Sequence, residues 1–227
     1  MDFIKGEVLL FDKPYGWTSF QLVNKVRFII KHKLKVKKIK VGHAGTLDPL
    51  ATGLVLICTG LETKKIGYYQ DLIKEYVATV KLGATTPSFD LETEIDEYFP
   101  YEHITEEMVN KVLKQYTGET FQEPPAFSAK FVDGVRAYKH ARKGKSIKLL
   151  DKKIVIHTLE ILKFNLPYIS MRIECSKGTY IRALARDIGK SLSSGAHLTH
   201  LLRRRIGDYR IENSLHIEEF ERNLVFL

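Results

Sequence analysis

The sequence is poor in cysteine, which limits both disulfide and metal chemistry. Its two cysteines, Cys58 and Cys175, lie far apart. Neither has a second cysteine or a histidine at the spacing of a metal-binding motif. We therefore expect two buried, reduced thiols and no metal site.

Long apolar segments are also missing. The first sixteen residues mix charged with apolar side chains, so they resemble neither a secretion signal nor an Arg-rich presequence. No other run approaches the roughly 18 apolar residues of a membrane-spanning helix. We expect a cytoplasmic protein that does not enter a membrane.

Acidic residues are too few to balance the basic ones, and the 227-residue chain carries a net charge of +9. Such an excess indicates an anionic partner, most often nucleic acid and less often a membrane surface. The basic residues gather between residues 25 and 43 and again from Arg203 to Arg210. Each cluster alone is also typical of a solvated face, and that alternative stays open.

Hydrophobic periodicity predicts strands and helices that do not alternate as regular βαβ units. The strands are expected at 6–11, 54–58, 74–82, 154–164, 168–175 and 198–210. Asp133-Gly134 predicts a hairpin turn. No repeat, low-complexity tract or linker divides the chain. We expect an α+β fold with one domain over residues 1–227.

Capping residues predict where the helices begin. Thr18 or Ser19 is expected to cap a first helix, and Thr105 a second. Further helices are expected at 136–143, 181–192 and 217–224. The residues of the second helix expected to face inward are Met108, Val109, Val112, Leu113 and Tyr116.

Three segments could carry chemistry. The stretch from Gly42 to Gly53 is rich in Gly and Thr around Asp48, and no Gly-Lys-Ser/Thr follows to make it a phosphate loop. An aspartate before a proline is usually a turn former or a helix cap, and this reading stays open. Arg182 opens a helix after a glycine turn, and Tyr76 begins a strand. By default these two are a surface arginine and a half-buried aromatic.

Taken together, these segments resemble the TruB-type tRNA pseudouridine synthases, relatives of the guide-dependent dyskerin-type enzymes. The matching segments, in order, are Leu9–Pro14, Gly42–Gly53, Lys74–Tyr76, Pro124–Ala129, Arg136–Tyr138, Lys177–Arg182 and Gly195–Thr199. The resemblance covers most of the chain. It implies the pseudouridine synthase fold, a mixed, largely antiparallel sheet with flanking helices and an RNA-clamping insertion at about 124–152. Because the chain ends at Leu227, we expect no C-terminal RNA-binding domain.

The resemblance also implies roles for individual residues. Asp48 matches the aspartate that attacks the flipped uridine, Tyr76 the tyrosine packed on the base, and Arg182 the arginine paired with the carboxylate. His43 would fill the space that the base leaves, and Leu201 would line the pocket. The residues expected to contact substrate or RNA are His43, Tyr180, Leu201, Lys64, Arg142 and Arg203. The family commonly has Leu-Arg-Arg-Thr where this chain has Leu-Leu-Arg-Arg, so the contacts near Arg203 stay open.

The implied reaction is the isomerisation of uridine 55 in the T arm of tRNA. It gains no atom, so no cofactor is expected, and the enzyme would be a monomer with no obligate protein partner. The main alternative is a non-catalytic protein of the same fold that binds or folds RNA. A guide-dependent catalytic subunit and a nucleotide-binding enzyme are less favoured, because the tail is short and a phosphate-loop motif is missing.

Overall fold

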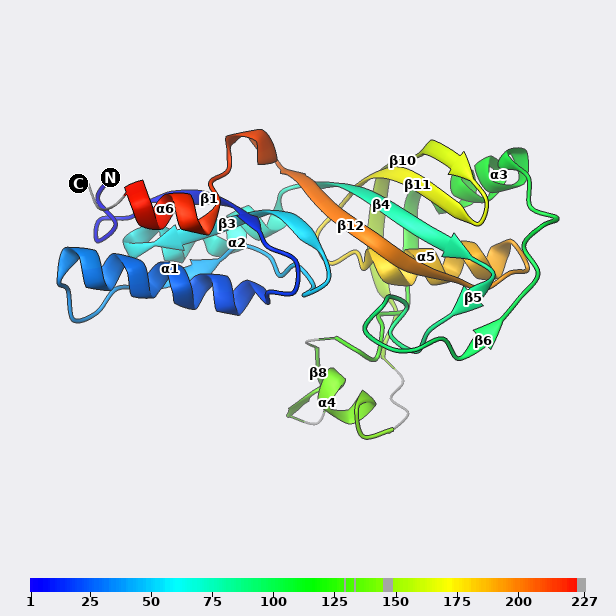
Figure 1. The fold of residues 1–227 in the computed structure, drawn as a ribbon, viewed down its shortest axis with the longest axis horizontal. Helices are drawn as coiled ribbons and strands as arrows, with labels where there is room; N and C mark the ends of the chain where they lie inside the picture. The colour runs from blue at the N-terminus through cyan, green and yellow to red at the C-terminus, as the bar shows by residue number, and fades with distance from the viewer. Residues whose placement is uncertain (129, 133, 145–148, 224–227) are drawn as a thin grey trace. The chain divides into compact units, whose positions relative to one another are not determined.

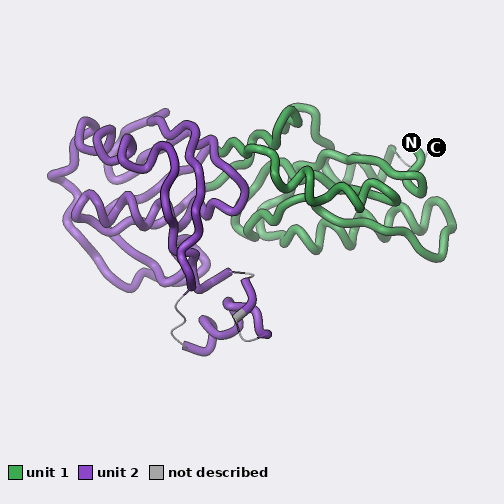
Figure 2. Tube along the Cα trace, turned by 180° about the vertical axis from the view of Figure 1, so that it is seen from behind, with its two compact units in different colours: residues 1–76, 201–227 green, residues 77–200 purple. Residues whose placement is uncertain are grey.

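The computed structural model describes residues 1–128, 130–132, 134–144 and 149–223. The chain divides into two compact units (Figure 2): unit 1 contains residues 1–76 and 201–227, and unit 2 contains residues 77–200. The division falls inside strands β4 (Lys74–Leu82) and β12 (Ala196–Ile206), so each of these strands contributes residues to both units. The elements are labelled in Figure 1.

Unit 1 is built around strand β3 (Thr52–Thr59), which is buried along nearly its whole length. On one side β3 pairs antiparallel with β1 (Val8–Lys13), and β2 (Val41–His43) also pairs antiparallel with it. On the other side Leu202 and Arg203 of β12 run parallel to the start of β3. A two-residue strand, β13 (Tyr209–Arg210), turns back on β12.

The first helix, α1 (Ser19–Leu34), begins where the sequence predicts. Thr18 is its N-cap, and its hydroxyl accepts from the backbone N–H of Gln21, whose side chain accepts from the N–H of Thr18. One face of α1 is buried, including Leu22, Val26 and Ile30. Unit 1 also contains a 3-10 turn (Gly60–Lys65), α2 (Ile66–Asp71), a second 3-10 turn (Ile211–Asn213) and α6 (Ile217–Asn223). Leu224, expected in the last helix, lies outside the described residues.

Unit 2 contains the longest hairpin, β10 (Lys152–Asn165) with β11 (Tyr168–Cys175). Strand β7 (Gly118–Gln122) pairs antiparallel with the start of β10, and β4 lies between β11 and β12. Short ribbons join β5 (Ala84–Thr85) to β6 (Glu97–Tyr98) and β8 (Phe131–Val132) to β9 (Val135–Arg136). Asp133, in the predicted hairpin turn, is outside the described residues. The mostly antiparallel pairing confirms the predicted α+β class.

Three helices accompany these strands: α3 (Glu106–Tyr116), α4 (Ala137–Ala141) and α5 (Ile181–Ser191). Thr105 caps α3 as predicted, by accepting from the N–H of Met108. The expectation that Met108 faces inward is wrong: this side chain is exposed, because it lies in the first turn beside the solvated Glu106 and Glu107. Val109, Val112 and Leu113 are buried as predicted.

Both cysteines are buried, as expected. Within the described ranges, no helix combines the length and the apolar character needed to cross a membrane.

Gly53 is a position beside the Asp48 loop where the backbone leaves no room for a side chain. Its φ is +108°, and a Cβ there would lie 2.4 Å from the carbonyl oxygen of Arg203 on the neighbouring strand. We predict that Gly53→Ala lowers the free energy of unfolding by about 2–3 kcal/mol or more, because it adds backbone strain to a clash. The measurement is urea unfolding of the purified protein.

Gly67 in α2 is the matched control. It has no unusual φ, and a Cβ there meets nothing within 4 Å. Gly67→Ala should therefore be neutral or stabilise the protein by about 0.5–1 kcal/mol, because it reduces the entropy of the unfolded chain. Equal effects of the two substitutions would show that the close approach at Gly53 does not limit stability.

Candidate functional site

Asp48 is half-buried on the loop between β2 and β3, and its neighbour Leu47 is held by the first residue of α1. The hydroxyl of Ser19 donates to the carbonyl of Leu47 (3.1 Å) and accepts from its N–H (2.9 Å). Ser19 and Leu47 are both almost fully buried. This two-way contact fixes the backbone on one side of the aspartate.

Lys13 holds the other side of Asp48. It is the last residue of β1, and its side chain is fully buried. Its ammonium donates to the carbonyls of Pro14 (2.9 Å), Trp17 (2.6 Å) and Pro49 (3.2 Å). Pro49 directly follows Asp48, so the loop is anchored at both neighbours of the carboxylate.

Arg203 ties the loop to β12. Only 1% of this residue is exposed. Its guanidinium donates to the carbonyls of Leu54 (2.7 Å), Thr46 (3.2 Å) and Gly45 (3.1 Å). The expected contact of Arg203 with RNA stays a prediction; in the structure its donors are directed at the backbone inside unit 1.

The positive charges beneath the loop are costly to bury. The pKa of Lys13 is lowered from 10.5 to about 8. Burial is the main cause and the charge of Arg203 acts in the same direction, whereas Asp48 and Asp12 oppose the shift. The carboxylate of Asp48 thus lies within electrostatic reach of a buried ammonium. Two carboxylates, Asp12 and Asp48, partly offset the cost of this charge.

His43 ends β2 at the start of the loop. Burial lowers its pKa below the usual value, the charge of Arg203 lowers it further, and a backbone hydrogen bond to Gly45 opposes them. The ring is therefore neutral near pH 7. Its Nδ1 is buried and has no hydrogen-bond partner in the described part of the chain. This nitrogen is a polar group that a ligand could satisfy.

The other predicted residues of unit 1 differ in exposure. Tyr76 on β4 is 8% exposed and Leu201 on β12 is 5% exposed, so both residues are buried. Lys64 in the 3-10 turn is exposed. Of these three, only Lys64 carries a charge at the surface.

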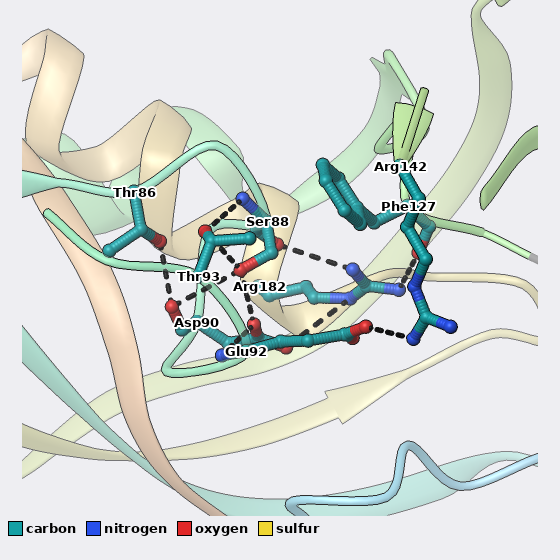
Figure 3. A network of polar contacts seen from close by, with 8 residues as sticks. All are labelled: Thr86, Ser88, Asp90, Glu92, Thr93, Phe127, Arg142 and Arg182. Carbon is teal, nitrogen blue, oxygen red and sulfur yellow. Dashed lines mark hydrogen bonds and ion pairs between the residues drawn. The ribbon is translucent and has the colours of Figure 1, made fainter. Parts of the chain in front are cut away.

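Arg182 is the centre of a polar network in unit 2 (Figure 3). It lies in the first turn of α5 and is 3% exposed. Its guanidinium donates to the carbonyls of Ser88 (3.2 Å) and Phe127 (2.6 Å), and its Nε lies 4.0 Å from a carboxylate oxygen of Asp90. The default reading of a surface arginine is therefore wrong.

Asp90 orders the loop that faces Arg182. Its carboxylate accepts from the hydroxyl of Ser88 (2.6 Å) and the N–H of Glu92 (3.0 Å), and its carbonyl accepts from Thr86 (2.7 Å). Phe89 has a φ of +65°, which is unusual for a residue that is not glycine. Asp90 is buried although it opens an acidic stretch, and nothing in the spacing of that stretch marks one of its aspartates as buried.

Two more predicted residues surround this network. Arg142, from the segment after α4, forms an ion pair with Glu92 at 2.7 Å and is well exposed (Figure 3). Tyr180 precedes Arg182, with its ring centroid 5.9 Å from the guanidinium carbon. The Tyr180 backbone exchanges two hydrogen bonds with the side chain of Gln122.

The predicted residues thus fall into two sets. Unit 1 contains His43, Asp48, Lys64, Tyr76, Leu201 and Arg203, and unit 2 contains Arg142, Tyr180 and Arg182. The expected pairing of Asp48 with Arg182 joins the two sets, and it stays a prediction. Among the residues that the structure describes, no group of three or more His, Cys, Asp or Glu is placed to hold a metal ion.

Comparisons with known proteins converge on one family. The family model "TruB family pseudouridylate synthase (N terminal domain)" matches residues 31–181. The chain is 60% identical over 220 residues to tRNA pseudouridine synthase B of Phocaeicola vulgatus, and the match covers 97% of this chain and 94% of that protein. It is 55% identical to the protein of the same name from Flavobacterium johnsoniae, with 98% of each chain covered.

A solved structure supports the fold. The "Crystal Structure of a Cbf5-Nop10-Gar1 Complex" matches with a TM-score of 0.72 and 26% identity, over 99% of this chain and 56% of that one. The present chain therefore spans little more than half of this structural neighbour.

Arg203 offers a test of the loop anchors. We predict that Arg203→Met lowers the free energy of unfolding by about 3 kcal/mol or more. Three carbonyls lose their donor: that of Leu54 is buried and those of Thr46 and Gly45 are partly buried. An unsatisfied buried group costs about 1–3 kcal/mol, and no longer burying a charge offsets only part of the loss. Urea unfolding measures the change.

Arg204 is the control, because it is exposed on the same strand and pairs with Glu212 at the surface. Arg204→Met should unfold at nearly the wild-type urea concentration, since exposed ion pairs contribute little. If the two variants are equally stable, the three carbonyl contacts do not anchor the loop.

Proposed function

Because the chain belongs to the TruB family of pseudouridylate synthases, we propose that it converts uridine 55 in the T arm of tRNA to pseudouridine, with Asp48 as the essential residue. The protein is an isomerase that modifies tRNA, the activity for which relatives 55–60% identical over nearly the whole chain are named. The choice of uridine 55 and the role of Asp48 are our extension of that activity, and they rest on the matching motifs.

The reaction requires little more from the protein than one correctly positioned carboxylate and a pocket for the base. The N1–C1′ bond of uridine breaks, the base turns, and a C5–C1′ bond forms, so no atom is gained or lost. An ionised carboxylate can act as a nucleophile at C1′ or C6, or can assist proton removal. Asp48 is the residue that we assign to this work.

The anchoring of the Asp48 loop is the observation that carries the proposal. Ser19 holds Leu47 and Lys13 holds Pro49, so the residues on both sides of Asp48 are fixed by buried side chains. A turn former on the surface needs no such support. A carboxylate that must meet a reacting atom does, because misplacement by about 1 Å can cost a hundredfold in rate.

Arg182 and Tyr76 complete the proposed site. An arginine paired with Asp48 would hold the carboxylate ionised and orient it. Arg182 is suited to this role because backbone carbonyls and Asp90 already fix its guanidinium. Tyr76 would supply a stacking surface, worth roughly 1–3 kcal/mol per base, which helps to offset the few kcal/mol needed to unstack the uridine.

The remaining assignments are also proposals. The segment at about 124–152 would clamp the RNA stem-loop, with Lys64, Arg142 and Tyr180 among the residues that contact the substrate. His43 and Leu201 would line the space around the extruded base. We propose that the enzyme works in the cytoplasm as a single-domain monomer, without guide RNA or an obligate protein partner.

Replacement of the carboxylate tests the catalytic proposal. Asp48→Asn should reduce pseudouridine formation on unmodified tRNA by roughly a thousandfold or more, since only binding and positioning remain. Nucleoside mass spectrometry of the treated tRNA measures the product, and thermal unfolding confirms that the variant is folded.

Asp208→Asn, at an exposed turn between β12 and β13, is the matched control and should keep full activity. An Asp48→Asn enzyme as active as wild type would refute the assignment. A wild-type protein that binds tRNA but makes no pseudouridine would instead favour a non-catalytic RNA-binding protein.

Salt titration tests whether RNA phosphates are the anionic partner of this basic chain. We predict that the logarithm of the tRNA association constant falls steeply with the logarithm of salt concentration between 50 and 200 mM, by roughly one unit per phosphate contact. Filter binding with unmodified tRNA measures the slope. A slope near zero would show that the positive charge does not act through phosphates.

A further inference from the structure

The outward face of α1 forms a hollow that no step of the proposed reaction uses. Its volume is about 390 Å³, within the range of roughly 300–1,000 Å³ typical of ligand sites. We call it the α1 hollow, and its lining residues are Asn24, Arg27, Phe28, Lys31, His32 and Val36. All of them belong to unit 1.

Phe28 is the most unusual residue of the α1 hollow. It is 61% exposed although it lies on a helix whose opposite face supplies much of the core. The ring of His32, one turn later, lies nearly parallel to it, with a centroid separation of 6.0 Å and an interplanar angle of 22°. The two rings offer flat, solvent-accessible surface on which a planar group can stack.

The stretch of sequence that carries these rings has charge of one sign. No acidic residue occurs between Asp12 and Asp48, whereas Arg27 and Lys31 line the hollow, and further lysines follow up to Lys40. Arg27 is held in place, because its guanidinium donates to the side chain of Asn24 (2.8 Å) and to the carbonyl of Val41 (2.9 Å). These two bonds use two of the five donors of a guanidinium. The hollow therefore combines aromatic surface with a fixed cation.

We propose that the α1 hollow binds a single-stranded stretch of RNA outside the modified uridine, with one base stacked on Phe28 and adjacent phosphates at Arg27 and Lys31. Aromatic platforms flanked by cations are how proteins hold single strands without reading their sequence. The proposal rests on the proposed function only in taking RNA as the substrate.

Two other partners fit the α1 hollow less well. A membrane-surface helix needs a continuous apolar face to insert, but the apolar face of α1, including Leu22, Val26 and Ile30, is buried in unit 1. Double-stranded RNA presents phosphates, and its paired, stacked bases offer nothing to an exposed ring. Only an unpaired base uses both the ring and the cations.

Direct binding to short RNAs tests the proposal. We expect wild-type protein to bind a labelled ten-nucleotide oligouridine more tightly than a ten-base-pair RNA duplex in fluorescence anisotropy. Phe28→Ala should weaken oligouridine binding by roughly 5- to 150-fold, the loss expected for one stacked base. Lys31→Gln should reduce the salt slope by about one unit.

Phe20→Ala is the matched control, because Phe20 lies on the same helix, is 62% exposed and does not line the hollow. It should bind oligouridine like wild type. Equal binding by the two phenylalanine variants would overturn the proposal, as would a wild-type preference for the duplex. The proposal would also be overturned if Phe28→Ala lost binding to phosphatidylserine vesicles but bound oligouridine as tightly as wild type.

Kinetics separate this proposal from the catalytic one. With full-length tRNA, Phe28→Ala should raise KM and leave kcat unchanged. With a short stem-loop that carries the target uridine and no other single strand, it should behave like wild type. If wild type makes no pseudouridine, the proposed function fails, whereas the oligouridine comparison still decides the α1 hollow.

Discussion

Positive charge buried against backbone carbonyls is the interaction on which the Asp48 loop depends. Lys13 and Arg203 each direct their donors at three carbonyl oxygens, and together these six contacts hold the loop, the turn before α1 and the start of β3. Such charges are expensive to remove from water, and only a full set of acceptors makes them tolerable. The geometry is therefore strict: a loop that moved away would take the Pro49 carbonyl from Lys13 and the carbonyls of Gly45 and Thr46 from Arg203.

The same charges bear on how a carboxylate can work beside RNA. Phosphates repel a carboxylate, whereas a cation attracts it. The buried ammonium of Lys13 lies within electrostatic reach of Asp48, whose charge raises the pKa of Lys13. Because Lys13 and Arg203 are enclosed by protein, salt screens them less than surface charges. The structural anchors of the loop thus also place positive charge near the proposed catalytic residue.

The elements that sequence predicted well are those specified by local pattern. The caps at Thr18 and Thr105 and the alternation of β4 depend on neighbours in the chain, and all three were predicted correctly. Burial of Arg203 and the loop around Asp90 depend on contacts between distant segments, which periodicity does not record. The short α2 was missed for a related reason, since six residues give too little repetition to reveal a helical period.

Buried basic side chains change the interpretation of the net charge of +9. Lys13, Arg182 and Arg203 are all interior, and their donors are directed at backbone carbonyls rather than at solvent. The number of basic residues in the sequence therefore overstates the number of cations that can contact phosphates. In the cluster from Arg203 to Arg210, for example, Arg203 itself is buried. The lysines after α1 are largely exposed, and no acidic residue intervenes. If electrostatic attraction to RNA is concentrated anywhere on unit 1, the segment from Lys31 to Lys40 has the charge and the exposure to provide it.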